Sequence, residues 1–231
     1  MKMIHRIAGI VVSLAFVIVL LITSFEIGIY SDFDRNEKEY KKYGVLTELE
    51  MEMDDVMDVT YEMMSYLRGN RENLDVETTV AGEVREFFND REKAHMVDVR
   101  NLFLGGMDLR LAASAIAIAA LLILMFAKAN WKKILPQSFL IGLGIFIVLV
   151  GILGVLVATD FNKYFILFHE IFFTNDLWLL DPDTDLMIRM LPEGFFFDMV
   201  IRIGSIFIIL LIVFIGISVF ALWKQRAVGK K

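Results

Sequence analysis

The sequence predicts an all-α integral membrane protein with four transmembrane helices and a mainly helical cap on the outer side of the membrane. The first observation is composition: 57% of the 231 residues are hydrophobic and the mean hydropathy is +0.62, which is too apolar for an ordinary soluble domain. The second is a set of four uncharged runs, each long enough to cross a hydrocarbon core of roughly 30 Å as a helix. These runs are residues 7–25, 111–127, 134–159 and 203–223.

The distribution of charge predicts which side of the membrane each segment faces. The two ends of the chain and the short segment 128–133 carry only positive charge, whereas all 29 acidic residues lie within residues 26–110 and 160–202. Lysine and arginine collect on the cytoplasmic side of membrane proteins. We therefore expect a multi-pass protein of the cell membrane with both termini in the cytoplasm.

The same patterns divide the chain into segments. Because no small-residue cleavage site follows the first apolar run, we expect a retained span rather than a signal peptide. The expected segments are transmembrane helices at 7–25, 109–129, 136–159 and 201–223, an extracytoplasmic cap at 26–108, a cytoplasmic loop at 130–135, an extracytoplasmic aromatic-rich segment at 160–200 and a cytoplasmic tail at 224–231.

Two helices are expected in the cap. Thr47 and Glu50 fit a capping box at the start of the first helix, and Gly69 ends it. The second helix is expected over residues 83–104, followed by a break or bend at the glycine pair 105–106.

Two of the three histidines, His95 and His169, lie in the outer segments, close in sequence to the apolar runs. An imidazole titrates near pH ~6.5, so each can take or give a proton at working pH. Two such groups in one pocket would suit general acid–base catalysis at a reacting carbonyl. The alternative for each is a packed histidine with a satisfied hydrogen bond.

Other kinds of site are excluded or weakly indicated. The chain has no cysteine, which excludes disulfides and thiolate chemistry. Residues 181–185 resemble the start of a calcium loop, but Leu186 replaces the required glycine, so a turn is favoured. The spans hold no charge between their ends, which argues against an ion-coupled transporter. The sequence shows no basic groove of the kind that binds nucleic acid. No cofactor or metal is expected.

Two stretches resemble the signature blocks of a known family. They are residues 88–102 (FNDREKAHMVDVRNL) and residues 168–185 (FHEIFFTNDLWLLDPDTD), the second followed by residues 191–197 (LPEGFFF). The chain resembles the lipoprotein intramolecular transacylase (Lit) family, integral membrane proteins of Gram-positive bacteria. The order of spans and outer segments is also similar over the whole chain.

The resemblance implies an acyltransferase. Its substrate would be a lipoprotein whose N-terminal cysteine carries a diacylglyceryl group and a free α-amine, and the sn-2 acyl chain would move to that amine to give a lyso-form lipoprotein. The enzyme would need no cofactor, and its partners would be this substrate and membrane lipid; we expect a monomer. By the motif match the catalytic residues would be His95 and His169. Supporting or substrate-binding roles are expected for Arg91, Asp98, Phe172, Phe173, Asn175, Asp176 and Trp178.

Several roles stay open at this stage. Asp98 could orient His95, Arg91 could steady an ester oxygen, and residues 175–176 could bind the ammonium group or a ring nitrogen of His169. The alternative for each is a salt bridge or a turn cap. The alternative function is a non-enzymatic membrane receptor or assembly factor whose outer cap binds a partner. A lipid hydrolase is a weaker alternative, because the sequence offers no nucleophile or metal site for one.

Overall fold

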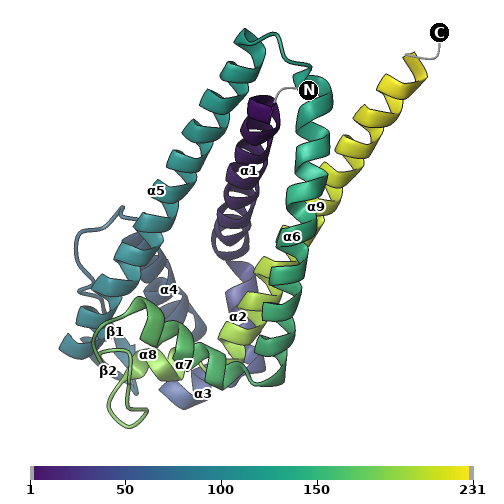
Figure 1. Ribbon diagram of the computed structural model, residues 1–231. Coiled ribbons are helices and arrows are strands. Elements are labelled where there is room, and N and C mark those ends of the chain that lie inside the picture. The colour runs from purple at the N-terminus through teal and green to yellow at the C-terminus, as the bar shows by residue number, and fades with distance from the viewer. Residues whose placement is uncertain (1–2, 229–231) are drawn as a thin grey trace. The chain divides into compact units, whose positions relative to one another are not determined.

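A computed structural model describes residues 3–228, which form two compact units. The span unit consists of residues 3–27, 107–159 and 203–228, and the cap unit of residues 28–106 and 160–202. Three of the helices begin in one unit and end in the other (Figure 1).

The span unit is built from four helices that are long and apolar enough to cross a membrane, which confirms the predicted fold class. A buried apolar core holds three of them together, and the side chains outside it are largely exposed and apolar, as lipid contact requires. The helices are α1 (Met3–Tyr30), α5 (Asp90–Phe126), α6 (Trp131–Thr159) and α9 (Glu193–Val228). The core residues are Val17, Leu20, Phe139, Leu143, Phe207 and Leu211.

The helices extend beyond the apolar runs that predicted them. Residues 131–135, which we expected in a loop, belong to α6, and Pro136 lies inside that helix. Proline is tolerated there because it lies in the second turn, where only one main-chain hydrogen bond is lost. Arg110 and Glu26 form an ion pair within the span unit, close to the ends of two apolar runs.

The cap unit contains short helices and one β-hairpin, together with the ends of α1, α5 and α9. Its centre is a set of fully buried side chains in which Tyr40 donates a hydrogen bond of 2.7 Å to the Thr60 hydroxyl. The elements are α2 (Asp34–Lys42), α3 (Val45–Leu49), α4 (Met53–Leu67), β1 (Glu77–Val80), β2 (Glu83–Glu86), α7 (Phe161–Phe172) and α8 (Leu186–Met190). The fully buried side chains include Tyr40, Val45, Leu49, Val56, Met63, Phe87, Phe88 and Met190.

The capping box predicted at Thr47 is wrong. Thr47 lies inside α3, and Glu50 adopts a left-handed conformation (φ 53°) that ends α3 and separates it from α4. The Glu50 carbonyl accepts a hydrogen bond of 3.0 Å from the main chain of Ala81, so this break is stabilised by a contact distant in sequence. The predicted stop is confirmed, because α4 ends at Leu67 and Gly69 has a φ of +83°.

The helix predicted over residues 83–104 is wrong at both ends. Its first residues form β2, which pairs with β1 through a two-residue turn in which Ala81 and Gly82 both have positive φ. The helix, α5, begins at Asp90 and runs without interruption through Gly105 and Gly106 (Figure 1). Each glycine costs a helix roughly 1 kcal/mol, which the long helical segments on both sides outweigh.

Candidate active site

The first turn of α5 is fixed by a reciprocal pair of hydrogen bonds. The Asn89 side-chain oxygen accepts from the Glu92 amide at 3.0 Å, and the Glu92 carboxylate accepts from the Asn89 amide at 2.7 Å. The capping box is therefore here, not at Thr47. The other oxygen of Glu92 accepts from the Met187 amide at 2.6 Å. Glu92 is fully buried, and its burial raises the pKa of the carboxyl group above its ordinary value.

A second contact ties this turn to the segment at residues 181–185. The Asn89 side-chain amide donates to Asp185 Oδ1 at 2.6 Å, and Asp185 Oδ2 accepts from the Asp181 amide at 2.7 Å. Asp185 is buried and serves the local main chain, so the turn interpretation is correct. Within residues 3–228 no group of three or more His, Asp or Glu side chains is arranged to hold a metal ion.

His169 lies on α7, whose first turn is capped by Asp160, and its ring is buried. Its Nδ1 donates a hydrogen bond of 2.7 Å to the main-chain oxygen of Phe165, one turn earlier. The ring stacks on Trp178 with centroids 4.9 Å apart and also contacts Phe165 at 4.3 Å and Phe168 at 5.3 Å. The aromatic residues around His169 in the sequence therefore also surround its ring in the structure.

His95 lies on α5 and is also buried. The ring centroids of His95 and His169 are 6.1 Å apart, although the residues are far apart in sequence. Phe173 contacts both rings, at 5.4 Å from His95 and 5.5 Å from His169. The Nδ1 atom of His95 is buried and makes no hydrogen bond to any other described residue.

Burial controls the protonation of both rings. His95 lies before the uncharged run 111–127 and His169 lies after the run 134–159, so both are outside these runs. Removal from water lowers the pKa of His95 to about 4, with a further contribution from the nearby His169. Burial also lowers the pKa of His169, against the opposing effect of the hydrogen bond to Phe165. Both rings are therefore neutral at pH 7, and each can act as a donor and an acceptor at once.

The loop after α7 is held against α5 by side-chain contacts. The Asn175 amide donates to Asp98 Oδ2 at 2.8 Å, and Arg91 donates to the main-chain oxygen of Asp176 and lies 3.8 Å from its carboxylate. Trp178 Nε1 donates to the Asn175 main-chain oxygen at 3.0 Å. Asp98 and Arg91 thus hold the loop, and the loop places Trp178 on His169.

A small cavity of about 200 Å³ is lined by Phe173, which contacts both histidine rings. Polar groups of α5 and of the loop line it together with two phenylalanines. Three of its residues were not predicted, because an isolated asparagine, threonine or leucine carries no signal in a sequence. The lining residues are Asp98, Asn101, Leu102, Phe172, Phe173, Thr174 and Asn175.

The site residues therefore come from two stretches of chain that the fold brings together, and the same two stretches carried the resemblance. The family model of the lipoprotein intramolecular transacylase Lit matches residues 10–196. The chain belongs to the Lit family. The resemblance found in the sequence is confirmed.

Solved structures agree with the fold of this Lit-family chain. It is similar to the membrane-integral lipoprotein intramolecular transacylase Lit from Bacillus cereus, with a TM-score of 0.75 and 22% identity over 96% of this chain and 98% of that one. A variant of the same protein with a histidine-to-alanine substitution gives a TM-score of 0.72 at 21% identity, covering 96% of both chains.

A relative from Aquifex aeolicus, described as an uncharacterized protein, is 33% identical over 133 residues. The aligned part covers 57% of this Lit-family chain and 54% of the relative, so the match spans about half of that protein's length.

Proposed function

We propose that this protein is a membrane acyltransferase that moves the sn-2 acyl chain of a diacylglyceryl-modified N-terminal cysteine to the α-amine of the same cysteine. The observation that carries the proposal is the buried pair His95 and His169, with ring centroids 6.1 Å apart in an aromatic enclosure. Membership of the Lit family supports it. The product is a lyso-form lipoprotein with one N-linked and one O-linked acyl chain.

His169 is the general base in this proposal. A main-chain carbonyl only accepts hydrogen bonds, so the bond to Phe165 requires the proton on Nδ1 and leaves Nε2 unprotonated in the neutral ring. Nε2 takes a proton from the attacking amine as its nitrogen bonds to the ester carbonyl carbon. The bond from that carbon to the glyceryl oxygen then breaks, and Nε2 returns the proton to this oxygen. No proton is gained or lost overall.

His95 stabilises the oxyanion of the tetrahedral intermediate. Its ring is neutral at pH 7 because its pKa lies at about 4, so one ring nitrogen carries a proton that it can donate without a charge on the ring. The buried Nδ1 atom, which has no partner among the described residues, supports a role in binding substrate. In the tautomer with the proton on Nδ1, this atom gains its hydrogen bond when the oxyanion forms.

The aromatic side chains enclose and orient the substrate. Phe173 and Trp178 contact the histidine rings and Phe172 lines the adjacent cavity, and a water-poor site favours aminolysis over hydrolysis of the ester. Donor and acceptor belong to one molecule, so holding them in a reactive geometry can supply roughly 7–11 kcal/mol of the barrier reduction. The polar cavity beside Asp98 and Asn175 suits the peptide groups that follow the cysteine.

The proposal also includes the side of the membrane on which the reaction takes place. Both termini lie in the cytoplasm and the histidines act at the extracytoplasmic face of the cell membrane, because basic residues alone flank the opposite ends of the spans. We expect the protein to act as a monomer, since both histidines come from one chain.

Mass spectrometry of a lipoprotein N-terminus tests the function. The protein is expressed in a bacterium that makes only the diacylglyceryl form, beside His95→Ala and His169→Ala variants at matched membrane levels. We expect the wild type to move one acyl chain to the amine and both variants to fail. An unchanged lipoprotein with wild type would support the receptor or assembly-factor interpretation.

A further inference from the structure

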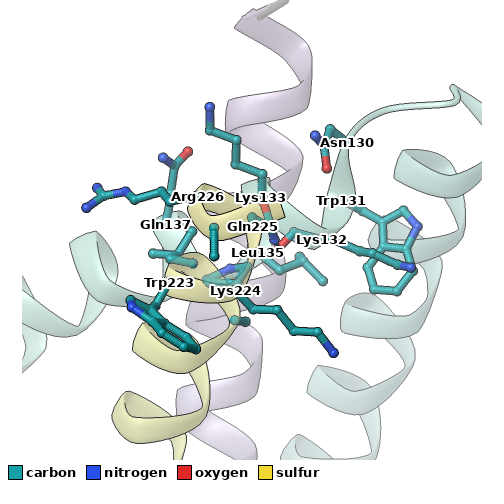
Figure 2. A pocket seen from close by; sticks show the side chains of 14 residues that line it. Asn130, Trp131, Lys132, Lys133, Leu135, Gln137, Trp223, Lys224, Gln225 and Arg226 are labelled. Carbon is teal, nitrogen blue, oxygen red and sulfur yellow. Dashed lines mark hydrogen bonds between the residues drawn. The ribbon is translucent and has the colours of Figure 1, made fainter. Parts of the chain in front are cut away.

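A second hollow lies in the span unit, outside the proposed active site. It is a groove of about 1450 Å³ between the beginning of α6 and the end of α9 (Figure 2). Four basic and two tryptophan side chains line it, with polar and apolar groups between them. The lining includes Trp131, Lys132, Lys133, Leu135, Trp223, Lys224, Gln225 and Arg226.

One hydrogen bond joins the two helices at the groove. Pro136 has no amide hydrogen, so the Lys132 carbonyl, four residues earlier in α6, lacks its helical donor. The Gln225 side chain of α9 donates to this carbonyl at 2.7 Å. The two helices are therefore joined by a hydrogen bond to a carbonyl that the proline leaves without its helical donor.

The cations in the groove have no protein partner of opposite charge. Lys132, Lys133, Lys224 and Arg226 make no ion pair within the part of the chain that the structure describes. The sequence also leaves none available nearby, because residues 109–159 and 199–231 contain no aspartate or glutamate. Four clustered positive charges attract an anion from outside the chain.

The tryptophans indicate which anion. Trp131 and Trp223 lie on opposite sides of the groove in Figure 2, and Lys132 Nζ lies 5.5 Å from the centre of the Trp131 ring. Tryptophan is enriched at the level of lipid headgroups, where one side of its ring meets hydrocarbon and the other meets water. The uncharged run of α6 begins at residue 134, three residues after Trp131, and that of α9 ends at Trp223.

We propose that this groove binds the headgroup of one anionic phospholipid, with its phosphate paired to the lysines and arginine and its glycerol portion against Trp131 and Trp223. A soluble phosphate would match the charges but would make no use of the tryptophans or of Leu135. Basic pockets between transmembrane helices are a known type of lipid headgroup site.

Native mass spectrometry of the purified full chain tests the proposal. Protein in detergent is incubated with phosphatidylglycerol or phosphatidylcholine, and bound lipid is counted for wild type, Lys132→Gln with Lys133→Gln, and Lys224→Gln with Arg226→Gln. The matched control pair is Arg6→Gln with Lys128→Gln, which removes the same charge outside the groove. Gln225→Ala keeps every charge but removes the bond that joins the two helices at the groove.

We expect wild type and the control pair to retain one phosphatidylglycerol in preference to phosphatidylcholine, and each groove pair to lower that affinity more than tenfold. Gln225→Ala should weaken retention with all charges present, which separates a built site from general attraction. Equal losses in the control and groove pairs, equal retention of both lipids, or displacement of the lipid by millimolar inorganic phosphate would each overturn the proposal. If one groove pair fails to fold, the other pair and Gln225→Ala decide the result.

Discussion

The Nδ1 atom of His169 donates a hydrogen bond of 2.7 Å to the main-chain oxygen of Phe165. Residues four apart lie one above the other on a helix, so α7 itself fixes which nitrogen of the ring carries the proton. A side-chain partner could be lost by substitution, but a carbonyl of the helix main chain cannot. The ring is thereby held with Nε2 as its base, next to His95.

The first prediction concerns the pH dependence of acyl transfer. The base must be unprotonated, and burial lowers the pKa of His169 below 6.5, so the acid limb that this ring gives to kcat/KM should lie on the acid side of 6.5. The substrate's α-amine, with a pKa of about 8, gives a separate limb that should be the same in every variant. Trp178→Ala admits water to the ring, raises this pKa and should move the acid limb to higher pH. The measurement is a pH–rate profile with a diacylglyceryl lipopeptide.

Trp223→Ala is the control for that profile, because Trp223 lies in the span unit and should leave the acid limb unchanged. If Trp178→Ala lowers kcat/KM equally at every pH, the stacked indole does not set the pKa of the base.

The second prediction concerns stability. The pKa of His95 is 6.5 in an unfolded chain and about 4 in the folded one, so the unfolded state binds more protons between these values. The contribution of the neutral ring is complete above pH 6.5 and is lost as the pH falls toward 4, by up to about 3 kcal/mol. His95→Gln should therefore show a smaller fall in Tm between pH 7 and pH 4.5 than wild type. Parallel curves for the two proteins would contradict the buried, neutral state of His95.

The third prediction tests the clamp at the start of α5. Glu92 accepts hydrogen bonds from the main chain at Asn89 and Met187, and Glu92→Ala leaves both buried amides unpaired. We expect a loss of about 2–4 kcal/mol in the free energy of unfolding, seen as a lower Tm in detergent. Glu92→Gln keeps one acceptor oxygen and should lose less. The control is Glu83→Ala on the exposed strand β2, which should change the free energy of unfolding by less than about 0.5 kcal/mol. If Glu83→Ala and Glu92→Ala lower it by similar amounts, the hydrogen bonds of Glu92 have no special role in stability.

The parts of the fold that could be predicted from the sequence are those that depend on interactions between residues close in sequence. The four spans depend on local hydropathy, so their composition was enough to predict them. The break at Glu50 depends on a hydrogen bond to Ala81, and the hairpin that contains Ala81 replaced the start of a predicted helix. Such distant contacts are not visible in a local pattern.

The site shows the same division. His95 and His169 were singled out because only three histidines exist, but their separation of 6.1 Å is a property of the folded cap unit. The capping signal at Asn89 and Glu92 was present in the sequence, yet Thr47 and Glu50 fit the usual pattern more closely. Only the buried environment of Glu92, which receives the Met187 amide from a distant segment, distinguishes the two.

The fourth prediction concerns the loop after α7. Asn175→Ala removes the bond to Asp98, which is exposed, so Tm should change little. The loop also places Trp178 on His169, so freeing it should lower kcat/KM by about tenfold, the result of a small misplacement of reacting groups. Asp98→Ala removes the same bond from the other side and should have the same effect. Additive losses in the double variant would show that the two residues act separately.

The last prediction concerns the span unit, where α1 and α6 approach closely at Gly9. A Cβ atom at this position would lie 2.5 Å from Ser138 Oγ and 2.6 Å from Ile134 Cγ2, closer than real side chains come. Small residues let transmembrane helices pack at such short range. Gly9→Ala must displace the side chains of Ser138 and Ile134 or push the helices apart, at a cost of about 1–3 kcal/mol. Gly142→Ala is the matched control on the facing helix, because its Cβ would meet Ser13 at an ordinary 3.8 Å. Thermal unfolding in detergent should show a lower Tm for Gly9→Ala alone, and equal values for the two variants would place the close contact of α1 and α6 elsewhere.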